Sequence, residues 1–554
     1  MTSFKLGINM AGAVSAGSYT AGVLDFLIEA LDEWYAAKGR GDLVPGHEVC
    51  LDVFSGASAG GMCAAIASAM VQGEFEHIHD TSLRDTNNRF YESWVNKIDI
   101  RELLKTRDLV DDGPVYSLLD CTIIDEIAKY ALVPGTSKKR AFISPNLTLF
   151  LTLTNLTGIP YSLNDVGSGS LEESTLYHAD RLRFETVLPG ASTSVPTAKP
   201  LPVGRPGEGA WPLLEEAAKA TGAFPIFLAP RQMKREAADY RYPMWESINA
   251  AVGDGPPVEP SWPSGTGPTI ETINVDGGVI DNDPFDLAHD YLAALNPPSP
   301  NNQNPREPLR AERAVVTVAP FPSQGVFTRN PDLQKDATVA AALAGLLSVF
   351  ISQSRFFGES LALITSGTSS RFVIAPSDTS LPPGTPALQC ASLGAFGGFF
   401  ERSFRAHDFQ LGRRNCQEFL RKHFALPTGN PIIASGLAAL GERSAQALAQ
   451  FKVKAPEDAS SELTSDWMPI VPLCSDAVAE DVPQPVPGKI SKDSLNEIVG
   501  LIEARMGAVL PLLLRDLPSE PLRLSLEGIA KLVELFGKGK IREYLEAQLG
   551  NAVE

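Results

Sequence analysis

The first seventy residues alternate between short apolar runs and longer amphipathic ones. Residues 4–9 read FKLGIN, which predicts a strand, and residues 18–37 follow with helical periodicity. The apolar residues that share one face of this predicted helix are Val23, Leu27, Leu31 and Trp34. A second apolar run at 49–54 precedes a segment of small residues that is typical of a buried helix. The chain therefore begins with a strand–helix–strand–helix pattern.

The same alternation continues further along the chain. Four more apolar runs with β-branched residues predict strands, at residues 147–156, 271–276, 314–321 and 371–376. Helical segments lie between them. Strands that alternate with helices favour a mostly parallel sheet covered on both faces, and so an α/β fold.

The pattern changes after about residue 378, where the strand signal fades. Residues 395–423 and 489–550 have helical character. We therefore expect two parts, an α/β domain at residues 1–378 and a mainly helical C-terminal region at residues 379–554. The length of 554 residues agrees with more than one domain.

Composition and charge narrow the class of protein. Apolar residues make up 44% of the chain and charged residues 20%, which is typical of a globular protein with an ample core. The formal net charge is −19. That charge argues against a nucleic-acid partner, which usually meets a basic surface, and against adhesion to anionic membranes by overall charge.

Cysteine usage and apolar runs indicate the compartment. Six cysteines are widely spaced and none forms a C-x-x-C pair, which is typical of reduced thiols in the cytosol. The long apolar run at 337–351 is shorter than the ~20 residues that span a bilayer, so a buried helix is favoured. We expect a cytoplasmic protein that makes at most transient contact with a membrane surface.

Residues 54–61 read FSGASAGG and place one serine among small residues directly after a predicted strand. Ser58 then lies at a strand–turn–helix corner, where a G-x-S-x-G nucleophile elbow holds its serine. Gly56 and Gly60 would leave room for the turn. A tightly packed corner without catalytic function has the same pattern, so the serine also needs a base and an oxyanion site.

Two other loops offer these groups. Residues 9–17 form a loop rich in glycine and alanine between the first strand and the first helix, where free N–H groups can bind an anion. Asp276 ends a predicted strand and precedes two glycines, and strand ends face the ligand side of open α/β sheets. A tight strand–helix turn and an Asx turn are the respective alternatives without a ligand.

These three loops, in this order, resemble the motifs of the patatin-like phospholipase family. Residues 12–17 are similar to its G-G-G-x-R-G loop, residues 56–60 match its G-x-S-x-G, and residues 276–284 are similar to its D-G-G/A with a following N-N-P. Residues 149–158 resemble the strand before the family's lid, and residues 220–230 resemble its small-residue segment beside the active site. The resemblance extends over residues 4–376.

The resemblance implies a three-layer, Rossmann-like sandwich and a lipid acyl hydrolase of the phospholipase A or lysophospholipase kind. In that family a Ser–Asp dyad cleaves acyl esters through an acyl-enzyme, without a metal, another cofactor or a histidine. Ser58 would be the nucleophile and Asp276 the base. Backbone amides of Gly12, Ala13 and Val14 would form the oxyanion hole.

The chain departs from the family pattern at four positions. Ala13 and Val14 replace two glycines, Ala16 replaces the arginine, and Asp283 replaces the second asparagine of N-N-P. The altered loop leaves open a non-catalytic scaffold of the same fold.

An α/β-hydrolase with a Ser–Asp–His triad is the other alternative. His289 and His407 follow Asp276 in the chain order of that class, although a packing or surface role is favoured for His289. The basic stretch at 402–422 favours a solvated helix face over a contact with lipid head groups.

Overall fold

The computed structural model of the chain describes residues 3–111, 113–135, 138–163, 173–240, 259–299, 303–322, 370–382, 385–455, 466–516 and 541–554. The apolar run at 337–351 lies outside the described residues. Within them, no helix combines the length and the apolar character needed to cross a bilayer.

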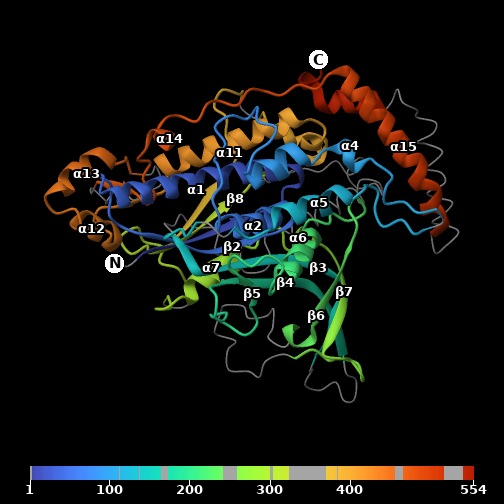
Figure 1. The fold of residues 1–554 in the computed structure, drawn as a ribbon, viewed down its shortest axis with the longest axis horizontal. Helices are drawn as coiled ribbons and strands as arrows, with labels where there is room; N and C mark the ends of the chain where they lie inside the picture. The colour runs from blue at the N-terminus through green and yellow to red at the C-terminus, as the bar shows by residue number, and fades with distance from the viewer. Residues whose placement is uncertain are drawn as a thin grey trace, which may run out of the picture.

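A central β-sheet organises the N-terminal two thirds of the chain (Figure 1). Its strand order is β5-β4-β3-β2-β1-β8-β9. The bounds are β1 Phe4–Met10, β2 Val49–Gly56, β3 Ile143–Leu163, β4 Glu173–Val187, β5 Lys199–Pro202, β8 Arg313–Val318 and β9 Arg371–Ile374. From β3 to β9 every neighbouring pair is parallel. The predicted mostly parallel sheet is therefore confirmed.

Strand β3 is longer than the predicted strand at 147–156, and it carries an antiparallel extension of the sheet. β3 pairs antiparallel with β4 and with β7 (Thr269–Asp276), and β7 pairs antiparallel with β6 (Arg231–Glu236). The sequence did not predict β4, β5 or β6. Strands β4 and β6 carry several charged residues and β5 is only four residues long, so the apolar alternation that marks a strand is weak in all three.

Helices cover both faces of the sheet and make three layers. On one face lie α1 (Gly17–Arg40), α2 (Ser58–Met70) and α6 (Trp211–Thr221), and Phe54 of β2 packs into the main core on this side. On the other face α7 (Phe285–Ala294) packs against Val53 and Val315. Adjacent residues of β2 point to opposite faces, and both are buried, as expected for a central parallel strand.

The C-terminal region is mainly helical, as predicted. It contains α11 (Arg402–Lys422), α12 (Pro431–Ala438), α13 (Ser444–Phe451), α14 (Asp476–Ala479) and α15 (Lys492–Asp516), with a short antiparallel pair formed by β10 (Ala425–Pro427) and β11 (Trp467–Pro469). α11 begins seven residues later than the predicted 395, because residues 395–399 form short 3-10 turns. The division at residue 378 stays a prediction.

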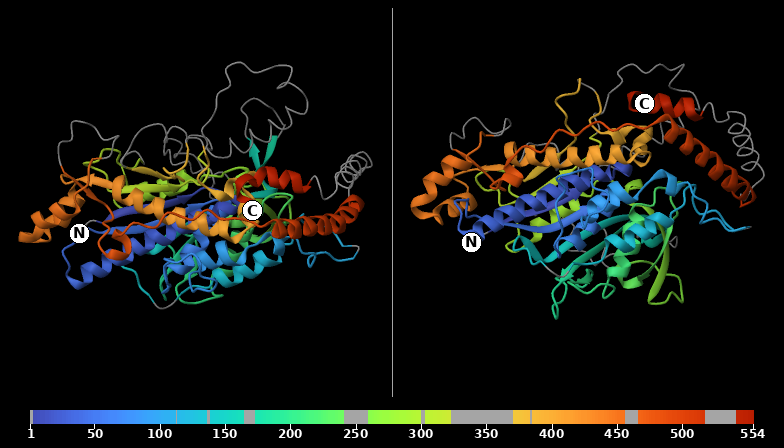
Figure 2. Two further views of the ribbon diagram at one scale, coloured as in Figure 1. Left: turned by 90° about the horizontal axis from the view of Figure 1, so that it is seen from above. Right: turned by 45° about the horizontal axis from the view of Figure 1, so that its top comes forward.

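α11 lies along α1, and glycines allow the two helices to approach closely (Figures 1 and 2). A Cβ on Gly22 would overlap with the carbonyl of Phe409, and a Cβ on Gly412 would overlap with the carbonyl of Tyr19. Phe409 and neighbouring apolar residues of α11 belong to the same buried cluster as β1 and β2. The C-terminal region thus completes the main hydrophobic core.

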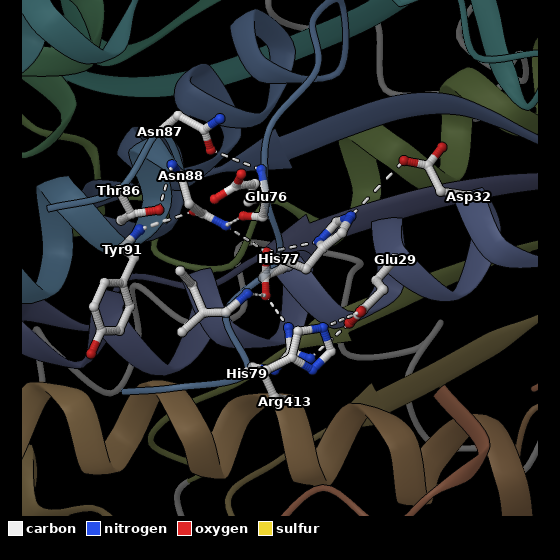
Figure 3. Close-up of polar contacts among 12 residues, drawn as sticks. Glu29, Asp32, Glu76, His77, His79, Thr86, Asn87, Asn88, Tyr91 and Arg413 are labelled. Carbon is white, nitrogen blue, oxygen red and sulfur yellow. Dashed lines mark hydrogen bonds and ion pairs between the residues drawn. The ribbon is translucent and has the colours of Figure 1, made fainter. Parts of the chain in front are cut away.

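A buried charged cluster also joins α1 to α11 (Figure 3). The guanidinium of Arg413 pairs with Asp25 and Glu29, and His77 contacts Asp25 from the segment after α2. His79 pairs with Glu29 at 2.8 Å. Burial alone would raise the pKa of Asp25, but Arg413 and His77 hold it well below its usual range. These charges are paired, which is the condition under which buried charges are tolerated.

The basic stretch at 402–422 is therefore not a solvated face throughout. Arg405 and Arg413 are each only 1% exposed and donate hydrogen bonds inward. Arg421 and Lys422, at the end of α11, remain at the surface beside Glu418. A charge run in sequence could not distinguish the inward from the outward members, because burial depends on α1 and on the segments around residues 77 and 95.

Candidate active site

A sharp corner between β2 and α2 carries Ser58. β2 ends at Gly56 and α2 begins at Ser58, whose φ of 53° lies in the left-handed region. A non-glycine residue in that region is strained, and such strain persists where the surroundings enforce it. A Cβ on Gly60 would overlap with the carbonyl of Met10, so only glycine allows β1 and the corner to come this close.

The hydroxyl of Ser58 points at Asp276. Its Oγ donates a hydrogen bond of 2.6 Å to Oδ2 of Asp276, although the two residues lie 218 positions apart. Strand β3 explains the meeting: Gly56 of β2 pairs with Leu151, and Asp276 of β7 pairs with Leu153, two residues further along the same edge of β3, while β4 occupies the opposite edge. The sheet register therefore brings the two predicted residues together.

Burial makes Asp276 an unusual carboxyl. Its residue is 2% exposed, and desolvation raises the pKa of Asp276 to about 7. The hydrogen bonds from Ser58 and from the amide of Gly278 (2.7 Å to Oδ1) favour the ionised form and oppose that shift. A carboxyl with this pKa can both accept and return a proton near neutral pH, which is what a general base in a two-step reaction must do.

The predicted oxyanion loop lies directly against Ser58. A Cβ on Gly12 would lie 3.0 Å from Cβ of Ser58 and would overlap with Oδ1 of Asn282. The amide of Gly12 donates to the carbonyl of Asn282 at 3.1 Å, so it is already engaged. Among the described residues, no acceptor pairs with the amide of Ala13 or Val14. These two amides are the ones left to meet an anion.

Val14 adds a second point of strain beside the serine. Its φ is 48°, which a β-branched residue rarely adopts. The short 3-10 turn Val14–Ala16 then leads directly into α1, which begins at Gly17. Ala16 stands where the resembling family carries an arginine and is fully buried, so the loop is held here by packing rather than by a charge.

The segment at 220–230 borders the site, as its resemblance predicted. Thr221 Oγ1 accepts the amide N–H of Ser58 at 2.9 Å, and the carbonyl of Ala223 accepts the amide N–H of Asp276 at 3.0 Å. One short segment thus fixes both members of the pair. The sequence reasoning did not single out Thr221, although the segment that contains it carried the signal.

An apolar pocket opens at Ser58 and Val14 and has a volume of about 70 Å³. Its walls are almost entirely hydrocarbon and include Met62, Ile66, Trp94, Leu103, Ile127 and Leu228. The pocket follows the seam between the main core and a second buried cluster formed by α4 (Ile100–Leu103), α5 (Thr122–Ala131) and α15. Such a pocket suits an apolar group attached to a reacting carbonyl.

All seven histidines lie in the described residues, and none hydrogen-bonds to Ser58 or Asp276 or lines the pocket there. The ring of His289 contacts its neighbour Asp290, and the ring of His407 contacts Asp408. In the same part of the chain, no group of three or more His, Cys, Asp or Glu residues is placed to hold a metal ion. The described geometry is that of a two-residue pair.

Comparisons with known proteins agree with the motifs. The family model described as patatin-like phospholipase matches residues 9–289. A protein of Sinorhizobium fredii, described as uncharacterized protein y4iI, is 33% identical over 99% of this chain and 81% of its own length. The crystal structure of VipD from Legionella pneumophila aligns over 100% of this chain and 88% of its own, with 11% identity and a TM-score of 0.19, too low to bear on the fold.

Proposed function

Because the chain belongs to the patatin-like phospholipase family, we propose that it is a lipid acyl hydrolase that works through a Ser58–Asp276 dyad and an acyl-enzyme. The observation that carries the proposal is the 2.6 Å hydrogen bond from Ser58 Oγ to Asp276 Oδ2 at the mouth of an apolar pocket.

The first half-reaction forms an ester on Ser58. Asp276 accepts the hydroxyl proton while Oγ attacks the ester carbonyl of the substrate, which becomes a tetrahedral oxyanion. The amides of Ala13 and Val14, which belong to the loop beside Ser58, would donate to the oxyanion. Asp276 then gives the proton to the departing alcohol oxygen, the carbon–oxygen bond to that alcohol breaks, and the acyl group remains on Ser58.

The second half-reaction regenerates the enzyme. Water takes the place of the alcohol, Asp276 accepts one of its protons, and the oxygen attacks the acyl carbonyl. Asp276 returns the proton to Ser58 Oγ as the free carboxylic acid leaves. The pKa of about 7 suits both directions of this transfer, since a carboxyl group with a pKa far below 7 would return the proton well but accept it poorly.

The substrate class follows from the family and the pocket. The hydrocarbon walls beside Ser58 suit the acyl chain, so the ester bond is cleaved between a fatty acyl group and an alcohol. We further propose that the enzyme reaches its lipid by transient contact with a membrane surface, without nucleic acid. Its place in the cytoplasm stays a prediction.

The test is hydrolysis by the purified full chain, assayed on phospholipids, lysophospholipids and p-nitrophenyl esters. Wild type should release fatty acid, and Ser58→Ala should lose nearly all turnover, because nucleophile loss in serine hydrolases approaches ~10⁶-fold. A folded Ser58→Ala variant that keeps more than about a tenth of the wild-type kcat would rule out this nucleophile. A non-catalytic scaffold would show no turnover in wild type.

A further inference from the structure

The pocket beside Ser58 has a wall from outside the residues that the family model matches. Phe396 and Phe399 both line it, and they lie more than a hundred residues beyond residue 289. They belong to residues 389–399, a series of short 3-10 turns between β9 and α11. We call residues 389–399 the aromatic loop.

Two buried charges of α11 hold the ends of the aromatic loop. The carboxylate of Asp408 accepts the amides of Gln389 and Cys390, each at 2.9 Å. Arg405 donates to the carbonyl of Gly398 at 2.7 Å, and its side chain is 1% exposed. Buried charges are costly without partners, so these contacts fix the backbone of the loop at both ends.

The centre of the aromatic loop is tied to the oxyanion loop. The hydroxyl of Ser15, next to Val14, donates to the carbonyl of Ala395 and accepts the amide of Gly398 at 3.1 Å. Leu393 and Ala395 have φ values of 55° and 75°, which are strained for non-glycine residues. The strain persists because the surrounding hydrogen bonds determine the conformation. The aromatic loop is therefore a wall of the pocket whose backbone conformation is fixed by hydrogen bonds.

The ring of Phe396 stands at the centre of an aromatic group at this wall. Its centroid lies 5.1 Å from Phe227, 5.9 Å from Phe224 and 5.9 Å from Phe399. Phe224 lines the pocket as well. The rings therefore limit the space available to a chain that starts at Ser58.

We propose that the aromatic loop selects the acyl chain of the substrate. Phe396 and Phe399 form the wall against which one unbranched hydrocarbon chain packs, and their bulk sets the chain length that fits. This proposal rests on the proposed function, since it assigns the chain selectivity of the same site. It gives the C-terminal region a part in substrate recognition in addition to its part in the core.

The test is a chain-length profile with p-nitrophenyl esters from acetate through butyrate, octanoate and laurate to palmitate. In wild type, kcat/KM should rise by up to about fourfold per methylene until the pocket is filled, because a buried methylene contributes about 0.8 kcal/mol. Phe396→Ala should move the optimum to a longer ester, and Phe396→Trp should move it to a shorter one. The readout is the position of the optimum within each variant, so a uniform change in turnover does not enter it.

Phe372→Ala is the matched control. Phe372 is half-buried like Phe396 and packs against two phenylalanine rings at 5.0 and 5.8 Å, but it does not line the pocket. The ester chain length preferred by Phe372→Ala should be the same as that preferred by wild type.

The outcomes separate the two proposals. An unchanged optimum in either folded Phe396 variant, with all esters scaled alike, overturns the role of the aromatic loop and leaves the hydrolase standing. A wild-type chain that hydrolyses none of the esters and none of the phospholipids overturns the proposed function, and this inference with it.

Discussion

Asp276→Asn should abolish turnover and at the same time stabilise the folded protein above neutral pH. Burial raises the pKa of Asp276 from 3.8 to about 7, which means that the fold disfavours the ionised form that the proposed mechanism requires. The asparagine has nearly the same shape and never ionises. It also keeps an oxygen that can accept the amide of Gly278, as Oδ1 of Asp276 does at 2.7 Å.

The sign and size follow from proton linkage. Between the pKa of the unfolded chain and that of the folded protein, the folded state still binds a proton that the unfolded state has released. The free energy of unfolding of wild type therefore falls as the pH rises from 3.8 to about 7. At about 1.4 kcal/mol per pH unit, a shift of about three units costs roughly 4 kcal/mol at full ionisation.

The assay is thermal unfolding of wild type and Asp276→Asn across pH 4 to 8. The two midpoints should lie close together near pH 4, and the advantage of the variant should widen to a few degrees by pH 8, since ~1 kcal/mol moves the midpoint of a large domain by a degree or more. The control is Asp481→Asn, because Asp481 is exposed and Arg421 lowers its pKa. Its difference from wild type should not widen in that direction.

Two results would refute this reasoning. If the midpoints of wild type and Asp276→Asn run parallel across the pH range, the carboxyl does not titrate near neutrality in the folded protein. If Asp276→Asn turns over esters at the wild-type rate, Asp276 is not the base, whatever its effect on stability.

Three further predictions concern pH and metal. For ester hydrolysis, kcat/KM should fall about tenfold per pH unit below pH 7, because only ionised Asp276 accepts the serine proton, and a profile that stays flat down to pH 5 would contradict this. Burial lowers the pKa of His77, but Asp25 and the neighbouring carboxylates outweigh burial and raise that pKa to about 9. The destabilisation caused by His77→Gln should therefore be largest below pH 6.5 and should vanish as the pH rises through 9. A difference in melting temperature that does not change with pH would contradict a stabilising ion pair between His77 and Asp25. A chelator should leave turnover within about twofold, whereas loss restored by Ca²⁺ or Zn²⁺ would show a metal requirement.

The two residues of the Ser58–Asp276 pair could be singled out because their signals are local. Ser58 lies just after β2 and Asp276 is the last residue of β7, and each has a glycine within two residues, so the signal of each corner lies in a few consecutive residues. The order of the motifs then allowed the two to be joined, although they lie 218 positions apart. The geometry that suits Asp276 to the proposed role of base, its burial against the segment at 220–230, has no local signature.

The aromatic loop could not be predicted for the same physical reason. Phe396 and Phe399 lie in a glycine-rich stretch and have the sequence pattern of ordinary core residues. Their place in the pocket depends on hydrogen bonds from Ser15 and Arg405 to the backbone of the loop, and no neighbouring residue in the sequence predicts these contacts. Arg413 is the opposite case, since the sequence predicts a solvated residue and the structure buries it. A charged residue in a basic stretch is usually solvated, and only its pairing with the acidic residues of α1 makes the burial tolerable.

The central claim is that a carboxylate, without a histidine, activates a serine nucleophile. The most direct test is to label the full chain with a fluorophosphonate and to locate the adduct by mass spectrometry of the intact chain and its peptides. The account predicts one adduct on Ser58 in wild type at pH 8, none in Ser58→Ala, strongly slowed labelling in Asp276→Asn, and labelling near the wild-type rate in His289→Gln and His407→Gln. An adduct on another serine, or a well-folded histidine variant that fails to label, would contradict it.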